Sequence, residues 1–246
     1  MSEKLEKKIF EKLEDLKRHE AFVAWLREND GEPRADLIEL QIALENDKLT
    51  REKRFELEIQ ERRILNAHGR EWIGALADFI MMRDIPGRRF QTKPGCQIQW
   101  YRGWVYGLVL DELTLKLSKV LLQAPELRLF RRLTLIDPVN ASCDYLHEWG
   151  LLDKISDLDI SYGRITDKGA LTLGADRSLK KLKSVDMTGN QIGEEGLAAI
   201  RKNFPKVLVD DQNPIIIKRD EVEAAKPAAK PAAKPADKSD DNEDEE

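Results

Sequence analysis

The chain has 246 residues, of which 41% are hydrophobic and 35% are charged, and its net charge is -5. This length suits one or two domains, and two cysteines are too few for a disulfide framework. Residues 237–246 hold seven acids and one base, so residues 1–236 carry about +1, and no global basic field indicates a nucleic-acid partner.

Targeting signals are not evident in the sequence. The first twenty residues lack the apolar segment of a secretory signal, and no apolar run approaches the ~18 residues that a membrane span needs. We therefore expect a cytoplasmic protein that has no membrane contact.

The N-terminal part is predicted to be helical. Apolar residues recur at every third or fourth position over 3–28, and the turn-forming residues 29–31 end this first helix. A second helix is expected from about Arg34 and a third from Thr50, a good N-cap residue. With a short helical or looped segment after them, these helices make up an expected module over residues 1–80.

The next part of the chain changes its pattern. Residues 81–100 are expected to form an irregular connector, because two Pro-Gly pairs interrupt them. Beyond it, strands are predicted over 104–110 and 130–135, with a helix over 113–123 between them. A further strand is expected at 207–209.

Two later stretches, 27 residues apart, follow one pattern. They are Ile155-x-x-Leu158-x-Ile160-x-x-Gly163-x-Ile165 and Leu182-x-x-Val185-x-Met187-x-x-Asn190-x-Ile192. Each is followed by a helical stretch with a glycine at the same place, Gly169 or Gly196. This is the leucine-rich repeat signature, in which a strand turns its apolar residues inward and an Asn at the ninth place bonds to backbone groups inside the coil.

The repeat frame extends to earlier segments, with first positions at Val105, Phe130, Ile155 and Leu182. One repeat cannot bury its own apolar face, so stacked repeats create the core. The predicted fold is therefore α/β: the helical module, then a short solenoid over 101–218. Parallel strands line its concave face and helices its convex face. The Ala/Lys/Pro-rich and acidic residues 219–246 are expected to form a disordered tail.

The sequence resembles two known families. The glycine after each repeat's helix start resembles the ribonuclease-inhibitor class of leucine-rich repeats. The run Gly31-Glu32-Pro33-Arg34-Ala35-Asp36-Leu37-Ile38-Glu39-Leu40-Gln41, with Trp25-Leu26 before it, is similar to the bacterial repeat-companion domain that commonly precedes such repeats. His68-Gly69-Arg70-Glu71-Trp72-Ile73-Gly74 and Arg102-Gly103-Trp104-Val105 resemble its later landmarks. This chain departs from that pattern by one inserted residue before Gly31 and by Ala24 in place of Asp. The resemblance implies no established activity.

The candidate binding site is the concave strand face. Residues at the third, fifth and seventh places of each repeat should point out from the sheet. With the neighbouring aromatic Tyr162, the polar ones among them are Asp111, Arg132, Thr134, Asp157, Asp159, Ser161, Ser184, Asp186 and Thr188. Asp159 and Asp186 fall in one column of adjacent repeats, which favours a protein partner with a basic segment. A charged strand face that is simply solvated is the other interpretation.

Two alternative functions remain open. The amphipathic stripe at residues 5–16 could associate with another chain and serve assembly. Cys143 and His147, four residues apart, could share a helix face as a nucleophile–base pair, although no orienting third group is visible.

The three histidines are far apart in the sequence, so neither a metal nor a cofactor is expected. The main prediction is a non-catalytic interaction module.

Overall fold

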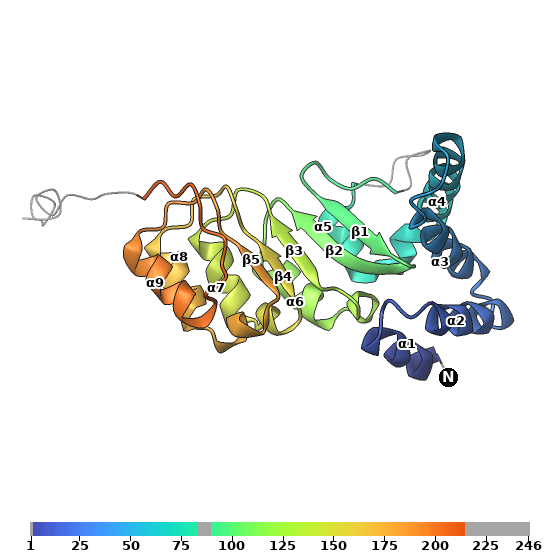
Figure 1. Cartoon of the computed structure of the whole chain (residues 1–246), viewed down its shortest axis with the longest axis horizontal. Coiled ribbons are helices and arrows are strands. Elements are labelled where there is room, and N and C mark those ends of the chain that lie inside the picture. Colours follow the sequence, from blue (N-terminus) through green and yellow to red (C-terminus); the bar gives the residue numbers. More distant parts are fainter. Residues whose placement is uncertain (1, 83–89, 215–246) are drawn as a thin grey trace, which may run out of the picture. The chain divides into compact units, whose positions relative to one another are not determined.

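The computed structural model describes residues 2–82 and 90–214. They form a helical N-terminal part and a five-stranded, mostly parallel sheet with helices, which confirms the expected mixed α/β class (Figure 1). The predicted tail over 219–246 lies outside the described residues.

The N-terminal helices are short except for one. They are α1 (Ser2–Glu11), α2 (Leu16–Glu28), α3 (Glu32–Leu44), α4 (Arg51–Trp72) and α5 (Ala77–Ile80), with a 3-10 turn η1 (Gly74–Leu76) before α5. Thr50 caps α4 as expected, because its side chain accepts a hydrogen bond from the Lys53 N–H at 3.2 Å.

The single helix predicted over 3–28 is wrong, because the chain breaks between α1 and α2. At the break, the Leu13 carbonyl accepts hydrogen bonds from His19 Nε2 at 2.8 Å and from Arg102 Nη1 at 2.8 Å. These tertiary bonds take a carbonyl that a continuous helix would use internally. The apolar side of α1 then folds back on this chain, with Ile9 fully buried and the Phe10 ring 5.1 Å from the Trp104 ring.

The second half of the described chain alternates strands with helices and 3-10 turns. The strands are β1 (Gln97–Tyr101), β2 (Trp104–Leu110), β3 (Arg132–Leu135), β4 (Asp157–Asp159) and β5 (Ser184–Asp186). The helices are α6 (Leu115–Gln123), α7 (Asn140–Glu148), α8 (Asp167–Ala175) and α9 (Glu194–Asn203), with 3-10 turns η2 (Pro125–Leu127), η3 (Leu151–Asp153) and η4 (Arg177–Lys181).

The strand β1 differs from the sequence expectation, because its first residues fall in the segment 81–100 that was predicted to be irregular. It pairs antiparallel with β2 through a two-residue turn at Arg102 and Gly103, whose φ angles are 45° and 82°. Positive φ at both turn residues is the geometry of the type I′ hairpin. Arg102 is held there by two hydrogen bonds to the Glu45 carboxylate, at 2.7 and 2.6 Å.

The parallel ladder confirms the repeat frame. Leu108, Leu133, Leu158 and Val185, the fourth places of successive repeats, are paired in register from β2 to β5. All four are at most 2% exposed, so the inward places build one continuous core. At the predicted fifth strand, only an isolated bridge forms, between Leu208 and Asp186.

Helices α7, α8 and α9 pack against one another in sequence beside the ladder (Figure 1). The Asn140 Oδ1 accepts from the N–H groups of Thr166 and Gly169 at 3.0 and 3.1 Å. One repeat later, the Asp167 Oδ1 accepts from Gly193 and Gly196 at 2.8 and 3.0 Å. Each helix thus provides an acceptor for the start of the next one, which satisfies N–H groups that a helix leaves unpaired.

Candidate functional site

The strand face places the predicted side chains in columns. Arg132, Asp157 and Ser184 form the third-place column, and Thr134, Asp159 and Asp186 form the fifth-place column, each paired in register. Parallel strands lie ~4.8 Å apart, so neighbouring members of a column are close. The expected pairing of Asp159 with Asp186 is confirmed.

A shallow hollow of about 540 Å³ lies over these columns. It brings together six of the predicted residues. They are Arg132, Thr134, Asp157, Asp159, Ser184 and Asp186. The predicted residues Asp111, Ser161, Tyr162 and Thr188 do not line it. Asp111 lies after β2, where its Oδ1 accepts from the Cys96 thiol at 3.3 Å.

The hollow also contains residues that the repeat pattern did not predict. They are Gln99, Lys183, Lys206 and Leu208, together with the inward Leu158 and Val185. Gln99 was missed because β1 was missed. Lys206 and Leu208 follow from a further repeat that begins at Phe204, in which they occupy the third and fifth places.

Gln212 occupies the ninth place of that further repeat. Its Oε1 accepts from the Ile192 N–H at 3.1 Å and its Nε2 donates to the Met187 carbonyl at 2.8 Å. Asn190 makes the equivalent bonds one repeat earlier, accepting from Ile165 at 3.1 Å and donating to the Ile160 carbonyl at 2.8 Å. The predicted role of Asn at the ninth place is thus confirmed.

The hollow has a mixed charge, with three carboxylates and three basic side chains around it. Asp157 shows how they interact. Burial acts to raise its pKa, but hydrogen bonds from Ser156 and Ser184 and the nearby charges of Arg132 and Lys183 outweigh it, so the pKa lies below its usual value. Both serine hydroxyls donate at 2.6 Å, one to each oxygen of the carboxylate. Asp157 therefore stays ionised at neutral pH.

In Asp159 and in Asp186, one carboxylate oxygen accepts a hydrogen bond from the backbone at the end of the same strand. The Asp159 Oδ1 accepts from the Ser161 N–H at 3.1 Å, and the Asp186 Oδ1 accepts from the Thr188 N–H at 2.9 Å. These bonds stabilise the turn that follows each strand. Among the described residues, the two Oδ2 atoms have no hydrogen-bond partner, which leaves them as acceptors for a ligand.

The residue after the seventh place has a left-handed backbone in successive repeats. These residues are Asp137, Tyr162, Gly189 and Asp211, with φ angles of 48°, 52°, 70° and 55°. Tyr162 is also 71% exposed, and Ile136, at the seventh place of the preceding repeat, is 45% exposed. One border of the strand face is therefore apolar.

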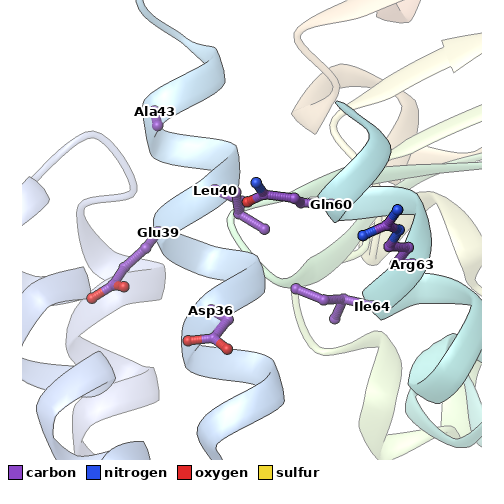
Figure 2. Close-up of a pocket in the computed structure, with 7 residues that line it drawn as sticks. All are labelled: Asp36, Glu39, Leu40, Ala43, Gln60, Arg63 and Ile64. Carbon is purple, nitrogen blue, oxygen red and sulfur yellow. The ribbon is translucent and has the colours of Figure 1, made fainter. Parts of the chain in front are cut away.

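A second depression lies between α3 and α4 and measures about 520 Å³ (Figure 2). Figure 2 shows Leu40 of α3 and Ile64 of α4 turned toward each other across it, with Gln60 and Arg63 on the α4 side. Asp36 and Glu39 accept hydrogen bonds from Arg27 Nη2 at 2.9 and 2.7 Å. Because Arg27 already pairs with both carboxylates, this groove offers a ligand less charge than the strand face does.

The environment of Cys143 does not favour the nucleophilic chemistry considered for it with His147. Cys143 is fully buried, and burial followed by the Asp144 charge raises its pKa to about 12, so the thiolate is scarce at neutral pH. His147 directs its Nδ1 at Asp176 Oδ2, at 2.9 Å. These environments give Cys143 the character of a packed core residue.

Residues 2–82 and 90–214 contain neither a cluster of metal ligands nor a helix that could span a membrane. No group of three or more His, Cys, Asp or Glu side chains in this part could hold a metal ion. None of its helices is both long and apolar enough to cross a membrane.

Comparison with known proteins agrees with the repeat geometry. The Leucine Rich repeat family model matches residues 154–174 and 178–200, the segments that contain β4 with most of α8 and β5 with most of α9. This match supports a leucine-rich repeat protein. No curated protein and no solved structure matches the chain.

Proposed function

From the leucine-rich repeats in this chain, a repeat type that generally mediates protein–protein interaction, we propose a non-catalytic module that binds a protein partner through its strand face. The observation that carries the proposal is the open hollow over β3, β4 and β5, in which the Asp159 and Asp186 carboxylates stand side by side. Two adjacent carboxylates repel each other unless a cation lies between them. A basic side chain of the partner supplies that cation.

The partner segment also meets positive charge. Arg132, Lys183 and Lys206 stand around the same hollow, so an acidic group beside the partner's basic residue fits better than a purely basic segment. Complementary charge of this kind favours specific association and suppresses wrong partners.

We also interpret the N-terminal part, over residues 1–80, as a module similar to the repeat-companion domain, joined by 81–100 to the stack over 101–218. Packing of the landmark residues supports this interpretation. The Gly103 N–H donates to Gln41 Oε1 at 2.7 Å, and the Arg34 guanidinium lies 4.4 Å from the Trp104 ring centroid. Residues that are distant in the sequence thus form one packed junction.

The proposed binding is tested with variants in which neutral amides replace the carboxylates. The double variant Asp159→Asn with Asp186→Asn removes two charges, yet each amide oxygen can still accept the N–H of its strand-end turn. A matched control, Glu194→Gln with Glu195→Gln, removes two exposed charges from α9 on the helical side. The measurement is affinity capture from a lysate of the cells that produce the protein.

The proposal expects a partner that the wild type and the α9 control retain and the strand-face variant loses. A partner retained equally by all three proteins would show that the acidic column does not contribute to binding.

A further inference from the structure

Tyr162 has a backbone conformation that its side chain disfavours. Of the four residues that follow the seventh place, glycine adopts the left-handed region freely and aspartate tolerates it, because its short side chain bonds locally. Tyr162, at φ 52°, is the exception. A bulky residue in this conformation carries strain, and such strain concentrates at functional positions.

The Tyr162 ring contributes little to the core. It is 71% exposed, and no hydrogen bond to its hydroxyl group forms within residues 2–82 and 90–214. The next repeat has a glycine where the ring lies, and a Cβ at Gly189 would be only 2.6 Å from Tyr162 Cδ1. The glycine therefore leaves room for the ring, which lies against this turn and stays largely exposed.

The surroundings of Tyr162 define what it can bind. Ile136 lies one repeat away and is also exposed, so the two side chains provide an apolar border. Asp159 precedes Tyr162 by three residues, so their backbones are at most about 10 Å apart. The Asp159 and Asp186 carboxylates and this apolar border thus lie within reach of one short peptide.

We propose that Tyr162 is a strained anchor, and that the partner is a peptide segment in which an apolar side chain packs on its ring while a nearby arginine or lysine pairs with Asp159 and Asp186. This inference rests on the proposed function of the strand face and adds the chemistry of the ligand. Tyrosine suits the role because it offers a large contact area with few rotatable bonds.

The strain is tested without any ligand, through thermal unfolding of Tyr162→Asn. Asparagine accepts the left-handed backbone more readily than tyrosine does. The unfolding midpoint of this variant is expected to equal or exceed that of the wild type. A midpoint lower by several degrees would show that the ring supports the fold, and would overturn the inference.

The ligand chemistry is tested with short fluorescent peptides that carry one arginine and one leucine in a glycine–serine background, at increasing separations. Peptides with only the arginine or only the leucine are compared. The wild type is expected to bind tightest when the two lie about three residues apart. Tyr162→Asn should weaken that binding about tenfold or more, the scale of a hot-spot truncation, and remove the benefit of the leucine.

Leu171→Asn is the matched control, because Leu171 is a leucine that is 40% exposed but lies on α8 and does not line the hollow. It should leave the preferred arginine–leucine separation unchanged. Binding without dependence on the leucine, or no binding to any of these peptides, would overturn the inference. If a captured partner requires Asp159 and Asp186 but binds Tyr162→Asn as tightly as the wild type, only the anchor role fails.

Discussion

Single residues account for several features of the repeat pattern, and the glycine after each helix start is the clearest. A Cβ at Gly169 would lie 2.6 Å from Asn140 Oδ1, and one at Gly196 would lie 2.5 Å from Asp167 Oδ1. Those oxygens are the acceptors for the start of the following helix. Glycine therefore recurs at this place because the capping side chain of the preceding repeat occupies the space.

Gly196→Ala should lower the free energy of unfolding by about 1–3 kcal/mol, the range for overpacking a tight site. The added methyl group displaces Asp167, and the N–H groups of Gly193 and Gly196 then lose their acceptor. Urea unfolding measures the change. Leu171→Ala, at a position 40% exposed on α8, is the control and should change the free energy far less. Equal effects for the two variants would contradict the packing argument.

The candidate site could be predicted in part from single positions. The register of Asp159 with Asp186 followed from the repeat spacing, because the period of a solenoid places equivalent residues beside one another. Lys206 was missed because the last repeat begins only 22 residues after Leu182 and ends its strand as a single bridge. The conformation of Tyr162 could not be predicted, because a tyrosine gives no signal for a left-handed backbone.

Among the structural elements, the strand-to-helix turn depends on the amide at the ninth place. Asn190 is fully buried, and its bonds join three neighbouring backbone groups. Gln212 repeats the pattern at the last described turn with a longer side chain that is only partly buried. Side-chain amide hydrogen bonds of the same kind therefore hold a buried turn at Asn190 and a more exposed turn at Gln212.

Asn190→Ala should cost about 2–6 kcal/mol, because it leaves the Ile165 N–H and the Ile160 carbonyl unpaired at about 1–3 kcal/mol for each group. Gln212→Ala should cost clearly less, since water can reach the groups it leaves. Comparing the two variants by chemical denaturation measures the difference. A larger loss for Gln212→Ala would mean that the last turn contributes more to stability than the inner one.

The elements of the N-terminal part were predicted less well than the repeats. Helix periodicity was correct for α3 and α4, but no glycine or proline marks the break between α1 and α2. That break depends on the Leu13 carbonyl and on Arg102, which is 89 residues away. The strand β1 was missed for a similar reason, since its Arg102-Gly103 turn lacks the usual Asn-Gly signal and is held by Glu45.

The stability that His19 contributes at the link between α1 and α2 should decrease in acid. Burial lowers the pKa of His19 below its usual value, against the opposing hydrogen bond to Leu13. The unfolded chain then binds the proton more readily, so His19 stabilises the fold above about pH 6.5 and this contribution is lost as the pH falls through the folded-state pKa. His19→Gln keeps an N–H donor without titrating, so its unfolding midpoint should fall less steeply below pH ~6.5. Parallel curves for the two proteins would contradict this assignment.

At the scale of the whole molecule, the repeats make a continuous core and leave one side of the sheet open. The inward places from Leu108 to Val185 are buried in register, while the outward places surround a hollow with both signs of charge. Cys143, in α7, belongs to the buried core and not to the strand face. The strand face therefore combines carboxylate acceptors with exposed apolar groups.

The most direct measurement of this claim is site-specific photo-crosslinking in the cells that produce the protein. A photoreactive residue replaces Lys183, which lines the hollow, or Lys202, an exposed position on α9. We expect a crosslinked partner from position 183, reduced by Asp159→Asn with Asp186→Asn, and none from position 202. Crosslinks from 202 alone, or equal yields from both positions, would contradict it.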